Sequence, residues 1–312
     1  MIAAYKTNYG TCYQGDATSL NQTSLWTEIE GKIDLIFTSP PFALARQKEY
    51  GNLAGEDYVK WFSSLTHLFS SLLKPRGSIV IEMGNAWVKG KPVMATQPLK
   101  ALIEFAHEGK WHLCQQFIWH NPARLPSPAQ WVNVERIRVK DSFTHIWWMS
   151  KHLKPKADNR RVLKRYSQSM LDLLERGTYN SGLRPSEHNI GETSFLTDNN
   201  GAIPSNVFSI SNTQSSSPYL AYCKKNSFKL HPARMPPEIV EFFVKFLTEP
   251  SDVVLDPFAG SNTTGAVAES LGRSWIAIEQ EIDYILGSRG RFSESEDLEA
   301  ILGLDDGKDI PS

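Results

Sequence analysis

Cysteine is scarce in this chain, and its three residues lie far apart. Cys12, Cys114 and Cys223 form no Cys-x-x-Cys pair and no cluster with histidine. This spacing argues against a disulfide framework and against a structural zinc site, so we expect no bound metal. Free cysteines suit a reducing compartment, and we therefore expect a cytoplasmic location.

Long apolar runs are also missing. No apolar segment approaches the roughly 18 residues that a membrane-spanning helix requires, so we expect no membrane partner. The segment MIAAYKTNYG at the start lacks a basic region followed by an apolar stretch, which argues against a signal peptide. The 312 residues are long enough for two domains, or for one large domain with an insertion.

The whole chain has no large excess of positive or negative charge, but two of its segments do. The formal net charge is −1, which at first argues against a nucleic-acid partner. However, residues 110–190 hold 14 Lys or Arg against 6 Asp or Glu, whereas residues 279–312 hold 3 against 10. Two solvated faces of opposite sign would explain this pattern. Because the basic region also carries aromatic residues, phosphate contact is plausible.

Strand-like and helical segments alternate along the chain, which predicts an α/β fold with a mostly parallel sheet. The segments 111–121 and 142–151 read as a late antiparallel pair. Residues 150–228 have a different texture, basic at first and then rich in Ser, Asn, Thr and Gly, and we interpret them as an inserted recognition region. The expected strands cover 8–17, 32–39, 77–84, 111–121, 142–151, 253–258 and 273–280, and the expected helices cover 58–77, 98–111, 236–250, 265–272 and 281–292.

The segment VVLDPFAGSNTTGA, residues 253–266, predicts a strand, a glycine turn and the start of a helix. Gly260 permits close approach of a ligand to the backbone, and the helix start presents free N–H groups. Glu279 ends the next expected strand, where nucleoside-binding α/β folds place an acid on the ribose hydroxyls.

Three kinds of ligand site compete for this turn. A P-loop needs Lys and then Ser or Thr after its second glycine, but Ala266 and Val267 follow Gly265. A dinucleotide fold needs a G-x-G-x-x-G pattern, which is incomplete here. A carboxylate aimed at the turn suits a cofactor with a positive amino group and no phosphate, such as S-adenosylmethionine. The alternative is a plain βαβ unit with a tight turn that binds no ligand.

The segment TSPPF, residues 38–42, ends the strand that begins near residue 32. Neither Pro40 nor Pro41 can donate a hydrogen bond to a strand ladder, so the strand stops abruptly at a small hydroxyl, a rigid bend and an aromatic ring. A stiff loop would explain this pattern, and so would the floor of a pocket.

Read together, TSPPF and DPFAGSNTTG resemble the β-group DNA amino-methyltransferases, in which the catalytic motif precedes the cofactor motif. The similarity is closest to the PvuII-type modification methylases, which act on N4 of cytosine, and it extends to WHNPARLPSPAQWVN, IRVKD and HPARMP. It implies a Rossmann-like, S-adenosylmethionine-dependent methyltransferase fold, with a circularly permuted motif order, one antiparallel strand and an inserted DNA-recognition region. The implied domains are a catalytic part over 1–149, a target-recognition region over 150–228 and a cofactor-binding part over 229–312.

The resemblance assigns roles to residues of both motifs. Ser39 Oγ and the Pro40 carbonyl would accept hydrogen bonds from the target amine, Pro41 would hold them rigid, and Phe42 would stack on a base that has left the duplex. Asn121 and His120 would border that base. The cofactor-binding residues are expected to be Asp16, Asp256, Phe258, Ala259, Gly260, Asn262, Thr263 and Glu279. The DNA-binding residues are expected to be Arg136, Arg138, Lys140, Lys151, Arg160 and Arg161.

The implied function is transfer of a methyl group from S-adenosyl-L-methionine to N4 of cytosine in double-stranded DNA, with S-adenosyl-L-homocysteine as product. A restriction endonuclease would be a functional rather than a physical partner, and the enzyme would be a monomer or a homodimer. Adenine-N6 methylation is the first alternative. Enzymes of that type usually carry Asp at the position of Ser39, but this association has exceptions. A non-catalytic DNA-binding protein on the same fold is an alternative of another class, and RNA or protein methylation is a third. A cytosine-C5 enzyme would typically need a Pro-Cys pair, which the chain lacks.

Overall fold

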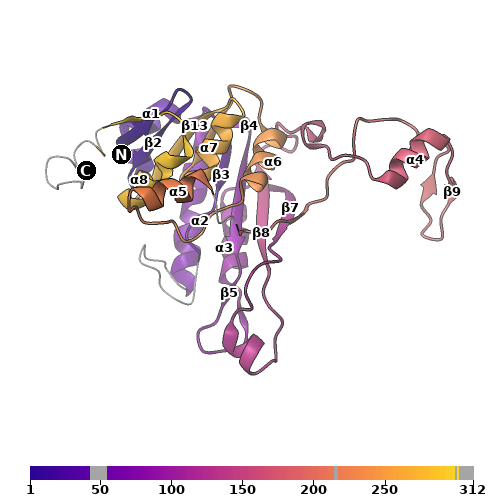
Figure 1. Cartoon of the computed structure of the whole chain (residues 1–312), viewed down its shortest axis with the longest axis horizontal. Helices are drawn as coiled ribbons and strands as arrows, with labels where there is room; N and C mark the ends of the chain where they lie inside the picture. The colour runs from indigo at the N-terminus through magenta and orange to yellow at the C-terminus, as the bar shows by residue number, and fades with distance from the viewer. Residues whose placement is uncertain (43–54, 214–216, 299–300, 302–312) are drawn as a thin grey trace. The chain divides into compact units, whose positions relative to one another are not determined.

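The computed structural model of the chain describes residues 1–42, 55–213, 217–298 and 301. Its centre is a ten-stranded sheet with the order β11-β7-β8-β4-β3-β12-β13-β2-β1-β14 (Figure 1). The strands are β1 (Ile2–Lys6), β2 (Gly10–Gln14), β3 (Ile33–Thr38), β4 (Leu73–Gly84), β7 (His112–His120), β8 (Phe143–Ser150), β11 (Val207–Ser209), β12 (Val253–Asp256), β13 (Ser274–Glu279) and β14 (Glu296–Asp297).

Helices cover both faces of this sheet. Ile36 of β3 packs in a core with the helices on one face, while the neighbouring Phe37 meets Phe243 of α6 on the other, as the alternation of a strand requires. All six residues of β3 are buried, which fits its apolar sequence and its central place. The helices are α1 (Ser24–Ile29), α2 (Gly55–Leu72), α3 (Gln97–Glu108), α5 (Pro218–Lys225), α6 (Pro237–Leu247), α7 (Thr263–Ser270) and α8 (Ile282–Ser288).

The predicted α/β class and mostly parallel sheet are confirmed. Strands β4, β3, β12, β13 and β2 run parallel, and β8 runs antiparallel between β4 and β7, as the late antiparallel pair predicted. A second reversed strand, β1, pairs antiparallel with β2 and β14, which the sequence did not signal. Its five residues are too short to show a period that can be told from a loop.

The parallel strands place a switch in chain direction at the centre of the sheet. Strands β3 and β12 are neighbours, but the chain leaves β3 through α2 toward β4 and leaves β12 through α7 toward β13. The connections therefore diverge and open a crevice outside the carboxyl ends of these two strands, the usual ligand site of open α/β sheets. TSPPF follows β3, and the glycine turn follows β12.

Residues 158–205 form a compact unit of their own, separate from the unit made of residues 1–157 and 206–312. It contains α4 (Gln168–Arg176), which ends at the left-handed Gly177, and the small hairpin of β9 (Gly182–Leu183) and β10 (Asn189–Ile190). The predicted insertion over 150–228 is therefore broader than the separate unit. Residues 206–228 supply β11 and α5 to the main unit, because a three-residue edge strand and an eight-residue helix leave little sequence signal.

Two further segments complete the description. The hairpin of β5 (Ala86–Trp87) and β6 (Met94–Ala95) follows β4, and the π-helical turn η2 (Gln130–Val134) lies in the connection from β7 to β8. The 3₁₀ turns are η1 (Ala17–Gln22), η3 (Asn159–Val162) and η4 (Arg289–Arg291). Among the helices described, none combines the length and the apolar character that crossing a membrane would demand.

Candidate functional site

A cavity of about 630 Å³ opens at the crevice between the ends of β3 and β12. This volume lies within the range of ordinary small-molecule sites. The cavity brings together both motifs that the sequence singled out, although they are more than two hundred residues apart. Its lining includes Asp16, Ser39, Pro40, Pro41, Phe42, Asp256, Phe258, Ala259, Gly260, Thr263 and Glu279.

Ser39 is the first residue beyond β3, and its hydroxyl has a defined orientation. Its Oγ donates a hydrogen bond to Oε2 of Glu82 over 2.6 Å. Glu82 lies near the end of the adjacent strand β4 and is only 3% exposed. Since the hydroxyl proton points at Glu82, the Ser39 lone pairs remain available to accept a hydrogen bond from a ligand.

Glu82 is a buried acid whose charge is incompletely compensated. Burial raises the pKa of its carboxyl, while the hydrogen bond from Ser39 and the positive charge of Arg124 lower it in part. Arg124 itself lines the cavity. The sequence analysis did not select Glu82, because a single acid within an apolar strand gives no motif. Its only signal is that a charged residue almost never occupies a buried strand without a role.

Phe42 occupies its place because the neighbouring strand ends in glycine. A Cβ built on Gly84 would lie 2.7 Å from the nearest ring carbon of Phe42, well inside van der Waals contact. The end of β4 therefore accepts the ring only with glycine at this position. The two prolines and this contact together fix the aromatic ring at the cavity wall.

Asp256 joins the two motifs. One carboxylate oxygen accepts a hydrogen bond from Thr38 Oγ1 over 2.9 Å, and the other accepts one from Thr264 Oγ1 over 2.7 Å. The backbone N–H of Phe258 donates to the same carboxylate over 3.1 Å. Burial raises the pKa of Asp256 to about 6, although these hydrogen bonds lower it in part. Asp256 lines the cavity, yet its oxygens are engaged mainly in holding TSPPF against the glycine turn.

Glu279 closes the glycine turn from the adjacent strand. Its Oε2 accepts a hydrogen bond from the Gly260 N–H over 2.7 Å, and its Oε1 accepts the N–H groups of Gln280 and Glu281, each over 2.9 Å. A carboxylate offers about four acceptor positions, so one position remains for a ligand hydroxyl. Burial raises the pKa of Glu279, and the backbone donors lower it in part.

Gly260 is required by its conformation and by its surroundings. Its φ of +52° lies in the left-handed region, and a Cβ there would stand 2.9 Å from Nε2 of His231. His231 packs its ring edge against Tyr284, and both residues line the cavity. The histidine of HPARMP therefore closes the cavity above the turn, a role that its sequence alone could not indicate.

Two expected cofactor residues have other principal contacts. Asn262 is fully buried outside the cavity, where its Oδ1 accepts the Gly265 N–H at the start of α7 and its Nδ2 donates to the Tyr5 hydroxyl. Its role in the structure is that of a helix cap. Asp16 lines the cavity, but one of its oxygens also accepts the Thr18 N–H at the start of η1. The other oxygen remains for a ligand.

Aromatic side chains on α2 form part of the cavity wall. Tyr58 and Trp61 both line the cavity, and Trp61 packs against Phe258 with ring centroids 6.0 Å apart. Trp119 also lines the cavity, while its Nε1 donates to the Ile210 carbonyl over 2.9 Å. Helical periodicity places such residues on an inward face, but it cannot separate a core face from a cavity wall.

A basic lobe stands beside the cavity. We define the basic lobe as residues 86–95 and 121–142, which connect β4 to β6 and β7 to β8, and it projects beyond the strand ends in Figure 1. It holds six Lys or Arg and two acidic residues. Arg138 Nε donates to the Pro92 carbonyl over 2.9 Å, and Asn85 Nδ2 donates to Asp141 Oδ1 over 2.9 Å, so the two segments are joined.

The basic lobe contains three of the residues expected to contact DNA. Arg136 and Arg138 are exposed, and the Lys140 ammonium group donates a hydrogen bond to the Pro122 carbonyl over 2.9 Å. Asn121 and Arg124, from the same connection, line the cavity. His120 does not line it and instead contacts Ser209 of β11.

Lys151 lies at the opposite end of the sheet from the cavity, a position that the sequence could not indicate. Because β8 runs antiparallel, its final residue Ser150 pairs with Ser78 at the amino-terminal part of β4. Lys151 follows there, donates to the Gly109 carbonyl and lies over the Trp111 ring at 5.3 Å. The reversal of one strand thus carries Lys151 away from the cavity, and its side chain packs beside the start of β7.

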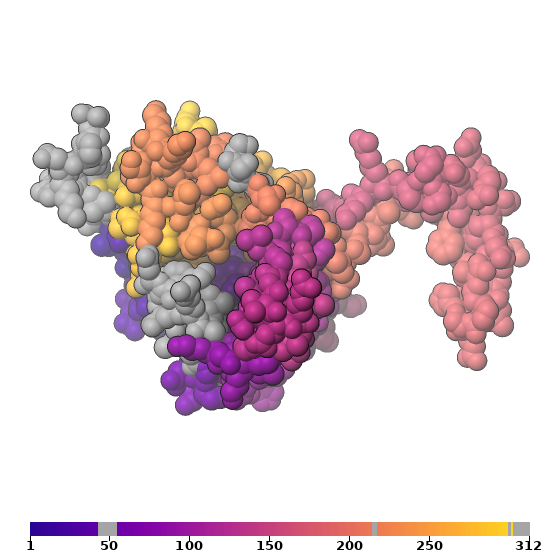
Figure 2. Space-filling model, turned by 60° about the horizontal axis from the view of Figure 1, so that its bottom comes forward, coloured from indigo at the N-terminus to yellow at the C-terminus, as the bar shows by residue number. Residues whose placement is uncertain are grey.

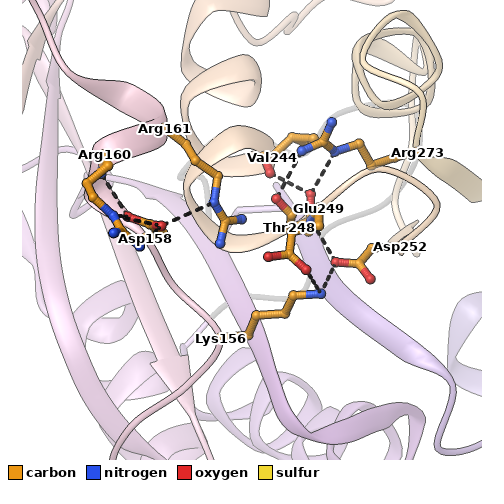
Figure 3. A network of polar contacts seen from close by, with 9 residues as sticks. All are labelled: Lys156, Asp158, Arg160, Arg161, Val244, Thr248, Glu249, Asp252 and Arg273. Carbon is orange, nitrogen blue, oxygen red and sulfur yellow. Dashed lines mark hydrogen bonds and ion pairs between the residues drawn. The ribbon is translucent and has the colours of Figure 1, made fainter. Parts of the chain in front are cut away.

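Other basic residues of the run 151–166 are engaged in ion pairs (Figure 3). Lys156 binds Asp252 over 2.5 Å and Glu249 over 3.1 Å, which ties this segment to the turn before β12. In the separate unit, Arg160 pairs with Asp158 over 2.7 Å, and Arg161 lies 3.9 Å from the same carboxylate. These contacts give Arg160 and Arg161 local partners, and their expected DNA contact stays a prediction.

Comparison with known proteins gives three similarities that agree with this geometry. A family model described as DNA methylase matches residues 33–288. The type II methyltransferase M.PvuII of Proteus hauseri is 45% identical over 294 residues, which cover 94% of this chain and 86% of that protein. The solved structure of the cytosine-N4-specific PvuII DNA methyltransferase aligns with a TM-score of 0.75 and 40% identity, covering 94% of this chain and 89% of the other.

A more distant structure agrees in fold. The M1.HpyAVI complex with SAM aligns with a TM-score of 0.51 and 18% identity, covering 90% of this chain and 98% of the other. At this identity, the similarity concerns the fold alone. The α/β arrangement of this chain is therefore shared with both solved structures.

Proposed function

Since the chain belongs to the DNA methylase family, we propose that it transfers a methyl group from S-adenosyl-L-methionine to the N4 amine of a cytosine flipped out of duplex DNA. The observation that carries this proposal is the oriented Ser39 hydroxyl, held by the buried Glu82 at the floor of the cavity. The similarity to M.PvuII, described as cytosine-N4-specific, supports the choice of target atom.

The cavity has the features that this cofactor requires. The left-handed glycine turn lets a ligand approach the backbone at Gly260, and Glu279 keeps one acceptor position for a ribose hydroxyl. The open oxygen of Asp16 suits an exocyclic adenine amine. We assign Phe258, Ala259 and Thr263 to the cavity wall and Asn262 to support of the turn. When bound, S-adenosylmethionine supplies a methyl group on a positively charged sulfur.

The residues after β3 would prepare the target amine. The lone pair of a cytosine amine is delocalised into the ring, so the amine is a poor nucleophile. If Ser39 Oγ and the Pro40 carbonyl accept its two hydrogens, the nitrogen is held with its remaining density free to face the methyl donor. Pro40 and Pro41 keep the acceptors rigid, and the ring of Phe42 would stack on the base.

Glu82 acts here as a positioning residue. As a carboxylate it can only accept, so it draws the Ser39 proton away from the base and leaves the serine oxygen as an acceptor. A protonated Glu82 could donate to Ser39 Oγ and compete with the amine for the same lone pair. The raised pKa of Glu82 places this competition nearer to neutral pH than for an exposed glutamate.

The DNA contacts belong to the proposal as well. The partner would be double-stranded DNA, with Arg136, Arg138 and Lys140 of the basic lobe on its phosphates or bases. We assign target recognition to the separate unit 158–205, with Arg160 and Arg161, rather than to the whole of 150–228. A restriction endonuclease would share the recognition site without physical contact, the enzyme would be a monomer or a homodimer, and it would act in the cytoplasm.

Mass spectrometry of nucleosides tests the reaction directly. DNA incubated with the protein and S-adenosylmethionine should gain N4-methylcytosine, and Ser39→Ala should abolish this gain. Cofactor affinity should stay within about twofold, since Ser39 faces the target amine and the cofactor-binding residues are unchanged. N6-methyladenine in its place would establish the adenine alternative. DNA binding without any methylated base would support a non-catalytic binding protein.

A further inference from the structure

Leu125 is a large apolar residue whose side chain is exposed to solvent beside the cavity. It directly follows Arg124, which lines the cavity, and it is 79% exposed. A single exposed leucine is ordinary on a protein surface. Three features of its surroundings, however, distinguish this one: a fixed backbone, a basic setting and its place next to the proposed base pocket.

The turn that presents Leu125 is fixed by its own hydrogen bonds. The Asn121 Oδ1 accepts the Ala123 N–H over 3.1 Å, and the Asn121 carbonyl accepts the Arg124 N–H over 3.1 Å. The Arg124 guanidinium donates to the Phe143 carbonyl over 3.2 Å. Because these hydrogen bonds lie within the protein itself, little conformational entropy is lost when Leu125 meets a partner.

The setting of Leu125 is basic and not merely apolar. Lys140 donates to the Pro122 carbonyl over 2.9 Å and so stands at the base of the same turn, with Arg136 and Arg138 nearby in sequence. Magenta residues of this connection stand forward on the face shown in Figure 2. Cations around an exposed apolar side chain match a duplex, whose phosphates surround stacked apolar bases.

The proposed reaction creates a place for such a side chain. Extruding a cytosine removes one base from the stack and leaves an apolar gap. The two flanking bases then lose their stacking contacts unless another group fills this gap. Apolar side chains such as leucine enter unstacked base steps in other DNA-binding proteins. Resting on the proposed function, we propose that Leu125 enters the base stack at the position that the flipped cytosine vacates.

The test compares a paired and an unpaired target in single-turnover methylation. The site is first mapped by sequencing DNA that the wild-type enzyme has methylated. Two duplexes then carry this site, one with the target cytosine opposite guanine and one with it opposite an abasic position, which lowers the cost of extrusion. Leu125→Ala should methylate the paired duplex about tenfold more slowly and the abasic duplex within about twofold of the wild type, because the wedge matters most where unpairing costs most.

Leu153→Ala is the matched control, since Leu153 is 77% exposed but follows β8 at the opposite end of the sheet. It should resemble the wild type on both duplexes. Equal rates for Leu125→Ala and wild type on the paired duplex would overturn the inference, as would an equal loss on both duplexes. The inference would also be overturned if Val139→Ala, in the basic lobe, methylated the paired duplex more slowly than the abasic duplex while Leu125→Ala did not. Failure of the wild type to methylate either duplex would instead refute the proposed function.

Discussion

At the scale of single residues, the site depends on two buried acids with different tasks. Glu82 orients the Ser39 hydroxyl, and Asp256 binds Thr38 and Thr264 so that the two motifs meet. Each has a raised pKa because burial disfavours its charge. An acid that is kept charged in a buried place has to be compensated by specific donors, and both acids have such donors.

Glu82→Gln should separate orientation from charge. Gln can still accept the Ser39 proton but cannot titrate, so we expect kcat to fall about tenfold and the acidic decline of the pH–rate profile to disappear. The wild type should lose activity as the pH falls through the raised pKa of Glu82, where the protonated acid competes for Ser39. A pH series of kcat/KM checks this. An acidic decline that is identical in both enzymes would show that another group titrates.

The buried carboxyl of Asp256 should make the stability of the folded protein depend on pH. Its pKa is raised from 3.8 to about 6, so between these values the folded protein binds the proton more tightly than the unfolded chain. Proton binding at Asp256 therefore adds on the order of 3 kcal/mol to the free energy of unfolding below about pH 4. This contribution is lost as the pH rises through about 6.

Asp256→Asn removes this titration. Denaturant unfolding at pH 4.5 and pH 7.5 should show the wild type losing more stability than the variant as the pH rises. Thr38→Val serves as a control, since it deletes one hydrogen bond but keeps the titrating acid. Parallel pH dependence of the wild type and Asp256→Asn would contradict the assignment.

At the scale of elements, the direction of one strand decides which charges lie beside the cavity. Because β8 is reversed, the connection 121–142 lies beside the cavity and the segment after Ser150 lies at the far end of the sheet. The dense basic run 151–166 attracts attention in the sequence, yet Lys151 and Lys156 contact the segments that precede β7 and β12. The weaker charge of the basic lobe is better placed.

This contrast predicts different effects on DNA affinity. Arg136→Ala combined with Arg138→Ala should weaken binding of duplex DNA several-fold and should reduce the salt dependence by about one to two ions. Lys151→Ala, at the far end of the sheet, should leave both quantities unchanged. Fluorescence anisotropy over a salt series measures them. Equal losses in the two variants would place DNA at both ends of the sheet or at neither.

The elements that the sequence predicted correctly are those with a clear period or a clear stop. The helix before Pro75 and the buried strand before Pro40 both follow from local chemistry. Strand β1, strand β11 and helix α5 were missed because they are short and are held by pairing or packing with distant residues. Glu82 was missed because a single acid forms no motif, and its contact with Ser39 exists only when β4 lies beside β3.

At the scale of the whole molecule, the motif order and the sheet order are complementary. TSPPF and the glycine turn are distant in the chain but follow neighbouring strands, and Asp256 couples them across the boundary. The sequence predicted both halves of the site, but their contact required the topology. The placement of residues 121–142 and of Lys151 at opposite ends of β8 likewise depends on the sheet and on no local motif, so only the fold could reveal it.

In the proposed reaction, the oriented Ser39 hydroxyl at this topological switch point positions N4 of cytosine to receive the methyl group of S-adenosylmethionine. Sequencing that maps modified bases, combined with nucleoside mass spectrometry, tests it on one DNA sample methylated by the wild type and one treated with Ser39→Ala. We predict N4-methylcytosine at a single short sequence in the first sample and none in the second. N6-methyladenine in the first sample, or N4-methylcytosine at equal levels in both, would contradict the account.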